Sequence, residues 1–298
     1  MKKIEIKHKS VLEKEVEKFL ATAKNGLYID TTVGGGGHSQ SILTLGGNLL
    51  GLDQDPKALQ MASKHLASAC PTSVYHLAHS NFANLKNIAQ EFKFVPADGI
   101  LFDLGISSLQ LEERGRGFSF LRDEPLDMRM DPQSQGVTAA DLVNALPKRR
   151  LYELFKEVDE KLAWPIVQAI VLKRKIAPIK TTGQLSQIVE KAYKKGWIHS
   201  KVHPATKVFL ALRIAVNSEL DNLKKGLNSA FEILKKEGRL VVISFHSGED
   251  RIVKNFFRLL EKEGKAEILT QKPVVATEEE LRKNPRARSA KLRALVKK

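Results

Sequence analysis

The first hundred residues alternate between short apolar runs and helical spacing. Each of four runs is almost continuously apolar, as in strands that are buried on both faces of a parallel sheet. Residues 56–69 instead carry a proline in the first turn and apolar residues at helical spacing, which predicts a helix. This alternation predicts right-handed βαβ units, and hence an α/β fold with a Rossmann-like, doubly wound, mostly parallel sheet. The predicted strands are residues 27–30, 48–53, 74–77 and 99–103.

A helical segment interrupts this α/β pattern. Residues 105–131 are rich in Gly, Ser, Arg and Asp and show no clear periodicity, whereas residues 137–195 carry apolar positions three and four apart. The economical interpretation is one α/β domain, made of residues 1–135 and 201–298, with an inserted helical domain at residues 136–200.

Strand patterns return near the C-terminus. Apolar spacing predicts one long helix over residues 208–234, and Gly238 is expected to end this helix and to open a strand at residues 239–244. A helix at residues 251–263 and a last strand at residues 266–269 complete the expected α/β domain.

The chain has a strong positive excess. Its 49 basic and 34 acidic residues leave a formal net charge of +15. A polyanion is therefore a favoured partner, because each phosphate that Lys or Arg neutralises releases condensed counterions. Residues 136–200 hold twelve basic and six acidic residues, and residues 282–298 hold eight basic and no acidic residue. We expect the insert to bind nucleic acid, with solvated surfaces as the alternative for both segments.

The cysteine count and the hydropathy pattern restrict the cellular setting. A single cysteine, Cys70, forms no internal disulfide and supplies no cysteine-based zinc site. The N-terminus begins like a signal peptide, but Glu5 and Lys7 interrupt any apolar region, and no later run is long enough to span a membrane. These features predict a cytoplasmic protein with no membrane partner and no bound metal.

A glycine-rich turn follows the first predicted strand. Residues 34–37 are consecutive glycines, which let the backbone turn tightly and approach a ligand closely, and no Gly-Lys-Ser/Thr follows as in a P-loop. Asp53 ends the second predicted strand and Asp103 ends the fourth. Open α/β sheets bind ligands at this edge, where a carboxylate at Asp53 is suited to the ribose hydroxyls of an adenosine cofactor.

Two cofactors remain open on these residues. NAD requires a Gly-x-Gly-x-x-Gly turn, and His38, Ser39 and Gln40 leave that pattern incomplete. S-adenosyl-L-methionine requires room for a sulfonium and an amino-acid tail, which the glycine loop together with Asp30 can provide. The residues favour S-adenosylmethionine without excluding NAD.

Longer motifs make the chain similar to a known family. They are DTTVGGGGHS at residues 30–39, DLGISSLQL at 103–111, RGFSF at 116–120, PLDMRMD at 125–131, HPAT at 203–206, RIAVNSEL at 213–220, ISFHS at 243–247 and NPRARS at 284–289. With these motifs the sequence resembles the bacterial 16S ribosomal RNA (cytosine-N4)-methyltransferases of the RsmH (MraW) type. The resemblance extends from His8 to Arg293.

The resemblance implies a class I S-adenosylmethionine-dependent methyltransferase with an inserted, RNA-binding helical domain. Its substrate would be one cytidine in the decoding region of 16S ribosomal RNA, free or in the small subunit, as a step of ribosome biogenesis. Gly248 and Leu109 depart from the family pattern, where a larger apolar residue and a proline are usual, which puts the local geometry in doubt. The implied cofactor contacts are Gly36, Gly37, His38, Asp53, Phe82, Asp103 and Gln110.

Asp103 is the candidate catalytic residue. Methyl transfer is an in-line displacement, so the protein positions two reactants and manages a proton. The exocyclic amine of cytosine is a poor nucleophile, and an acceptor such as Asp103, or a carbonyl in residues 105–107, would help to localise its lone pair and receive a proton. The alternative is that Asp103 only binds the cofactor. Methylation at C5 would need a cysteine nucleophile, and Cys70 is expected to be a small core residue.

Four further residues are candidates for contact with the RNA. Phe245 and His246 would form a wall of the nucleotide pocket, with ordinary packing as the alternative for Phe245. Arg116 and Arg129 would contact phosphates, and pairing with nearby acidic residues is their alternative.

Other classes of protein also remain as alternatives. One is a ribosome-assembly factor that binds RNA and cofactor without turnover, and another is a nicotinamide oxidoreductase. His246, Ser247 and Asp250 suggest a hydrolase, but neighbours along one strand end do not by themselves form a triad. A homodimer is compatible with the sequence.

Overall fold

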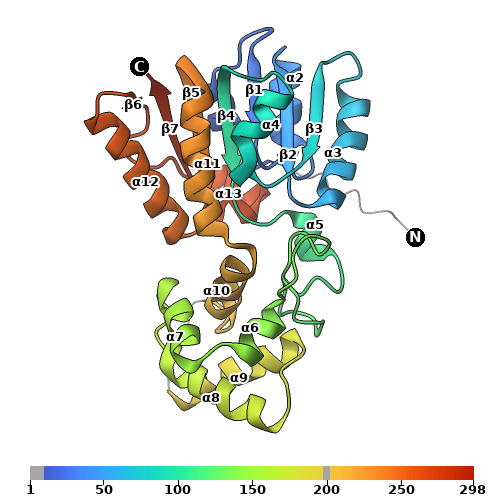
Figure 1. Cartoon of the computed structure of the whole chain (residues 1–298), viewed down its shortest axis with the longest axis vertical. Helices are drawn as coiled ribbons and strands as arrows, with labels where there is room; N and C mark the ends of the chain where they lie inside the picture. Colours follow the sequence, from blue (N-terminus) through green and yellow to red (C-terminus); the bar gives the residue numbers. More distant parts are fainter. Residues whose placement is uncertain (1–9, 197–201) are drawn as a thin grey trace. The chain divides into compact units, whose positions relative to one another are not determined.

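The computed structural model describes residues 10–196 and 202–298 (Figure 1). These residues form two compact units. Among the described residues, the first unit contains 10–107 and 220–298, and the second contains 108–196 and 202–219. The second unit is therefore inserted in the first and is wider at both ends than the predicted insert of residues 136–200.

A seven-stranded sheet forms the centre of the first unit in the described part of the chain, with the order β3-β2-β1-β4-β5-β7-β6. The strands from β3 to β5 in this order run parallel, and β7 is antiparallel to both β5 and β6. The predicted doubly wound, mostly parallel α/β sheet is thus confirmed. The strands are β1 (Leu27–Asp30), β2 (Asn48–Asp53), β3 (Tyr75–His79), β4 (Ala97–Asp103), β5 (Leu234–Ser244), β6 (Ala266–Ile268) and β7 (Lys291–Lys297).

Helices cover both faces of this sheet. They are α1 (Glu13–Leu20), α2 (Gly37–Thr44), α3 (Pro56–Ala69), η1 (Phe82–Asn84), α4 (Leu85–Glu91), α11 (Glu219–Ile233), α12 (Ser247–Lys262), α13 (Glu278–Lys283) and η2 (Pro285–Ser289). Leu50 of β2 packs in one core cluster with residues of α4, α11 and α12, whereas Leu49 packs in another with residues of α1, α2 and α3. Because successive strand residues point to opposite faces, a strand covered on both sides is apolar throughout.

Helix α3 occupies the range that the sequence predicts. Asp55 precedes it, and its side chain accepts a hydrogen bond from the backbone N–H of Lys57 at 3.0 Å, while Pro56 needs no partner for its nitrogen. Cys70 follows the helix and is buried, which confirms it as a core residue.

The predicted long helix over residues 208–234 is wrong. The chain forms α10 (Thr206–Asn217) and α11 instead, because Ser218 between them takes a left-handed conformation with φ 50°. Gly238 does not end the second helix either. Leu234 already pairs with Ala97 of β4, so β5 begins there and includes the predicted strand at residues 239–244.

The basic C-terminal segment is not a solvated tail. It contains β7, which lies between β5 and β6 in the sheet. Arg293 is 7% exposed, and its Nε lies 2.6 Å from Oδ1 of Asp250 on α12. The Nζ of Lys297 donates to the carbonyl of Leu234 at 2.6 Å. Part of this positive charge therefore stabilises the fold.

The second unit is helical. A side-chain amide of α10 organises the irregular segment at residues 113–138, since Asn217 donates to the carbonyl of Met128 at 2.8 Å and accepts from the N–H of Met130 at 2.9 Å. These bonds explain why the unit begins before the predicted residue 136. Its helices are α5 (Ser108–Glu112), α6 (Ala139–Ala145), α7 (Lys148–Glu157), α8 (Ala163–Ile176), α9 (Thr182–Lys195) and α10. Within residues 10–196 and 202–298, no helix has the length and apolar character of a membrane span.

Loss of the Arg293–Asp250 pair is expected to destabilise the first unit. Arg293→Ala leaves a half-compensated carboxylate in the sheet-to-α12 contact, so the free energy of unfolding in urea should fall by about 2–3 kcal/mol. Arg282→Ala is the matched control, because Arg282 and its partner Glu278 are 81% and 91% exposed at 3.7 Å. That control should change stability by less than about 0.5 kcal/mol. Equal losses in the two variants would contradict a structural role specific to Arg293.

Candidate functional site

Three aspartates end three neighbouring parallel strands of the first unit. Asp30 ends β1, Asp53 ends β2 and Asp103 ends β4, and β1 lies between the other two strands. The carboxyl ends of parallel strands open to the same edge of a sheet, where open α/β folds bind their ligands. The candidates Asp53 and Asp103 therefore share one edge with Asp30.

Asp53 holds the glycine loop that follows β1. The N–H of Gly34 donates to Oδ2 of Asp53 at 2.9 Å, and the N–H of Asp55 donates to Oδ1 at 2.9 Å. Gly34 has φ 53°, in the left-handed region that favours glycine. Burial raises the pKa of Asp53 to about 6, against the effect of these two hydrogen bonds.

The predicted cofactor residues Gly36, Gly37 and His38 form the start of α2. Gly36 has φ 87°, in the left-handed region that favours glycine, and a Cβ at Gly37 would require the side chain of Ser10 to move. His38 is 6% exposed. Burial lowers its pKa to about 4, with the backbone at Val11 acting in the opposite direction, so the imidazole is neutral at pH 7.

Asp30 joins the two ends of the glycine loop. Its Oδ1 accepts the N–H of Thr32 at 3.1 Å before the glycines, and its Oδ2 accepts the hydroxyl of Ser39 at 2.7 Å after them. The residue is 1% exposed, and burial raises its pKa to about 6 despite these bonds. Asp30 is thus placed to fix the loop.

Two threonines extend the pairing of β1 with β4. The N–H and the hydroxyl of Thr31 both donate to the carbonyl of Leu101 at 2.9 Å. The hydroxyl of Thr32 accepts the N–H of Asp103 at 2.6 Å. A side chain thereby replaces the next backbone acceptor, at the point where the chain leaves the sheet for the glycine loop.

His38 and Asp103 approach each other without a hydrogen bond. Nε2 of His38 lies 3.7 Å from Oδ2 of Asp103, which is longer than a hydrogen bond. Burial, followed by the charges of Asp30 and Glu249, holds the pKa of Asp103 well above its usual range. Among the described residues, neither Nε2 of His38 nor Oδ1 of Asp103 has a hydrogen-bond partner. Buried polar atoms are rarely left unpaired, so these two atoms point to a polar ligand.

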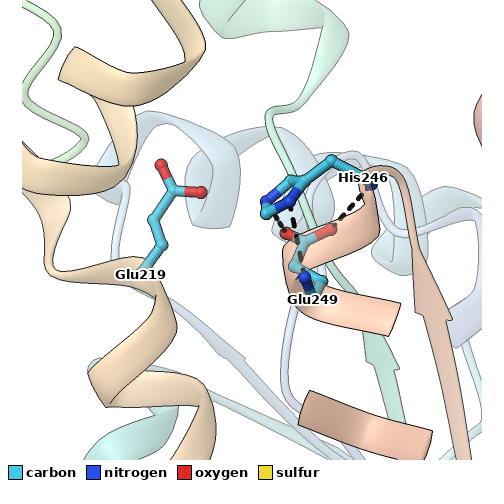
Figure 2. A group of neighbouring side chains, drawn as sticks. All are labelled: Glu219, His246 and Glu249. Carbon is cyan, nitrogen blue, oxygen red and sulfur yellow. Dashed lines mark hydrogen bonds and ion pairs between the residues drawn. The ribbon is translucent and has the colours of Figure 1, made fainter. Parts of the chain in front are cut away.

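His246 is held by the first turn of α12 (Figure 2). Oε2 of Glu249 accepts the N–H of Phe245 at 2.8 Å. The N–H of Glu249 donates to Nδ1 of His246 at 3.4 Å, and the N–H of His246 donates back to Oε2 of Glu249 at 3.3 Å. This reciprocal arrangement is a capping box, which satisfies free N–H groups of the helix. Glu219, also drawn in Figure 2, belongs to the second unit, where it pairs with Arg213 at 2.8 Å.

Two predicted aromatic residues pack within the first unit. The ring of Phe245 adjoins Gly105, because a Cβ there would lie 3.3 Å from Cδ2 of the ring. Phe82 makes an edge contact with Phe102 at a centroid distance of 5.6 Å, and a Cβ at Gly226 of α11 would lie 2.9 Å from it. Part of each ring is therefore used in packing.

The remaining predicted residues belong to the second unit. Gln110 lies in α5 and is buried. Arg116 is 8% exposed, forms an ion pair with Glu113 at 3.0 Å and donates to the carbonyl of Arg129 at 3.3 Å. Arg129 binds both carboxylate oxygens of Asp127. These contacts correspond to the alternative of pairing inside the protein, and contact with RNA stays a prediction for both arginines.

The arrangement gives no support to a hydrolase triad. Asp250 pairs with Arg293, and its second neighbour is Lys291 at 3.6 Å. The partner of His246 is Glu249.

Sequence reasoning missed three residues that shape this site. Glu249 could have been found, because a Glu three positions after a cap residue is a capping-box pattern. Thr32 and Ser39 could not, since only the fold shows that their hydroxyls meet Asp103 and Asp30.

The whole chain matches a known family. Residues 5–298 match the family described as the MraW methylase family. The chain belongs to this family. Membership confirms the resemblance and the methyltransferase class, and with it the expectation of a methyl-donor cofactor, S-adenosylmethionine. It leaves no support for a nicotinamide oxidoreductase.

Relatives of this family member share nearly their full length with it. Ribosomal RNA small subunit methyltransferase H of Syntrophotalea carbinolica is 46% identical over 308 residues and covers 97% of each chain. The protein of the same name from Thermomicrobium roseum is 46% identical over 306 residues, covering 96% of this chain and 92% of its own. A solved rRNA methylase from Streptococcus thermophilus is 10% identical with a TM-score of 0.44, covering 96% of this chain and 93% of that one.

Removal of the Thr32 hydroxyl is expected to weaken the edge of the sheet. Thr32→Val leaves the Asp103 N–H without its acceptor, so the free energy of unfolding should fall by about 1–3 kcal/mol, while Thr32→Ser keeps most of it. Thr22→Val is the matched control, because the buried hydroxyl of Thr22 has no partner among the described residues. Urea unfolding measures all three variants, and an equal loss in Thr22→Val would refute the assignment.

Asp30 is expected to impose a pH dependence on stability. Its folded pKa of about 6 exceeds the usual 3.8, so its contribution to folding is fully present below pH 3.8 and is lost as the pH rises through 6. Asp30→Asn removes the titrating carboxylate. The free energy of unfolding of the variant, relative to that of the wild type, should therefore rise by on the order of 3 kcal/mol between pH 3.5 and pH 7. The variant also lacks the charge that helps to raise the pKa values of Asp53 and Asp103, and this effect favours the variant in the same direction as the pH rises. A difference that stays constant with pH would count against a buried, titrating Asp30.

Proposed function

We propose that this protein transfers a methyl group from S-adenosylmethionine to N4 of a cytidine in the decoding region of small-subunit ribosomal RNA. The observation that carries the proposal is the shared edge of Asp53, Asp103 and the glycine loop in a member of a methylase family. The curated relatives are named ribosomal RNA small subunit methyltransferases, which supports ribosomal RNA as the substrate.

The edge of the sheet fits a nucleoside cofactor with a charged tail. Each oxygen of Asp53 accepts one backbone N–H, and a carboxylate oxygen has room for a second donor, such as a ribose hydroxyl. Nε2 of His38 is unpaired and suited to the polar tail. Gln110 enters the contact set from the resemblance alone. The proposed cofactor contacts are Gly36, Gly37, His38, Asp53, Phe82, Asp103 and Gln110.

Asp103 is suited to manage the proton of the reacting amine. Bound S-adenosylmethionine supplies a methyl group on a positively charged sulfur. Oδ1 of Asp103 would accept a hydrogen bond from the amine and then its proton. Burial and the neighbouring charges of Asp30 and Glu249 raise the pKa of Asp103, which strengthens its ionised form as a base. Protonation of Asp103 also removes a buried charge. The environment that disfavours the carboxylate therefore favours transfer of the proton from the amine to Asp103.

The RNA would present its target base unpaired or extruded, at a cost of about a few kcal/mol. Phe245 and His246 are the proposed wall of the base pocket. Both are partly buried, the ring of Phe245 packs beside Gly105, and His246 is hydrogen-bonded to Glu249. The helical unit, including Arg116 and Arg129, is proposed to bind the RNA backbone. A cytoplasmic location and a homodimer stay predictions.

The product formed on small subunits tests this proposal. The full chain is incubated with methyl-labelled S-adenosylmethionine and small subunits that lack the modification, and the RNA is digested to nucleosides. We expect the label in N4-methylcytidine. Label in 5-methylcytidine, or cofactor binding without any methylated nucleoside, would refute it, and the second result would identify an assembly factor.

Variants of two aspartates separate cofactor binding from catalysis. Asp53→Ala should weaken cofactor binding about tenfold or more in calorimetry, because charged hydrogen bonds to the ribose are lost. Asp103→Asn should lower the rate at saturating cofactor about 100-fold. Full recovery of that rate at saturating cofactor would show that Asp103 only binds. Asp221→Asn, at a side chain that is 74% exposed, is the control.

A further inference from the structure

The outer side of α8 carries exposed apolar side chains in a row. Trp164, Leu172 and Ile176 are 46%, 65% and 81% exposed. Together with the exposed Gln168 they occupy every fourth position, so they lie along one side of the helix, and we call these four residues the α8 stripe. The buried residues of α8, such as Ile166, lie on its other side. An apolar row of this kind on a helix surface indicates a binding surface.

A cation lies at the aromatic end of the stripe. Nζ of Lys148 on α7 lies 4.1 Å from the centroid of the Trp164 ring, and Tyr152 meets the same ring edge-on at 5.5 Å. Aromatic rings with an adjacent cation attract both the flat faces of bases and the phosphates that link them.

The surroundings of the stripe are basic. Residues 161–189 contain five basic residues and no acidic one. Arg174 is used in the fold, because its guanidinium donates to the carbonyls of Val143 and Leu146 at 2.8 Å. Lys161, Lys173 and Lys175 are exposed instead. Exposed positive charge therefore lies near the apolar side chains of the stripe in the sequence.

This combination selects against a second copy of the chain as the occupant. A two-fold dimer would place the same surface against itself, and the lysines would then face lysines. A single-stranded polynucleotide has the complementary chemistry, since its bases stack on aromatic rings and its phosphates pair with lysines.

We propose that the α8 stripe, with Lys148, Lys161, Lys173 and Lys175, binds a single-stranded RNA segment outside the target nucleotide. The proposal rests on the proposed function, because the RNA would be the small-subunit ribosomal RNA. It assigns to Trp164 the stacking of one base, and to the lysines the flanking phosphates.

Binding of a fluorescently labelled single-stranded fragment of the small-subunit RNA to the full chain tests the stacking role. Trp164→Ala should raise the dissociation constant about tenfold, and Trp164→Phe should restore most of the affinity, because stacking depends on an aromatic face. Leu259→Ala, at a 53% exposed side chain of α12, is the control for loss of exposed apolar area. Thermal unfolding of each variant confirms that the fold is intact.

The salt dependence of the same binding tests the charge role. Replacement of both Lys173 and Lys175 by Gln should reduce the slope of log affinity against log salt by roughly 1.4, since each phosphate contact on a single strand contributes about 0.7. Lys64→Gln on α3, also exposed, should leave the slope unchanged.

Three results would overturn the inference. The first is unchanged RNA affinity in Trp164→Ala and in the lysine variant. The second is a loss of binding to assembled subunits with unchanged binding to naked RNA, which would identify a protein partner. The third is self-association that Ile176→Glu abolishes while RNA binding persists. Absence of N4-methylcytidine with wild-type protein would refute the proposed function separately, because the affinity ratios are measured without methyl transfer.

Discussion

The hydrogen bond between the Thr32 hydroxyl and the Asp103 amide connects the ligand edge to the sheet. Backbone pairing between β1 and β4 ends where the chain turns into the glycine loop, and the hydroxyls of Thr31 and Thr32 continue it. Asp30 then fixes both ends of the loop. Asp103 and His38 are therefore positioned by the protein itself, and little rearrangement is needed when a ligand arrives, which is the basis of preorganised binding and catalysis.

Burial of like charges is the cost of this arrangement. The pKa values of Asp30 and Asp53 rise to about 6, that of Asp103 is held well above its usual range, and that of His38 falls to about 4, mainly because each group is removed from water. All four groups are thus driven toward their neutral forms. A nearby positive charge or a hydroxyl donor would favour the ionised carboxylates again.

The sequence predicted those parts of the structure that depend on local patterns. Strands buried on both faces form continuous apolar runs, and helix α3 begins with a capping aspartate and a proline, so both were recognisable. Strand β7 was missed because Lys291 and Arg293 alternate with its apolar residues, and only the fold shows their pairing with Asp250. Likewise, the strand ends located Asp53 and Asp103, whereas the hydroxyl contacts that hold them arise between distant segments.

Net charge alone does not locate a binding surface, because folding uses part of it. In the first unit, Arg293 pairs with a carboxylate and Lys297 donates to backbone carbonyls, and in the second unit Arg174 donates to carbonyls at the C-terminal end of α6. Side chains that are held in this way cannot also contact the phosphates of an external polyanion, because their donors are already used within the fold. Lys173 and Lys175 flank Arg174 in the sequence and are exposed. Because neighbouring residues of a helix point in different directions, Arg174 contacts the fold while Lys173 and Lys175 face the solvent. Only these exposed lysines can release counterions from a bound nucleic acid.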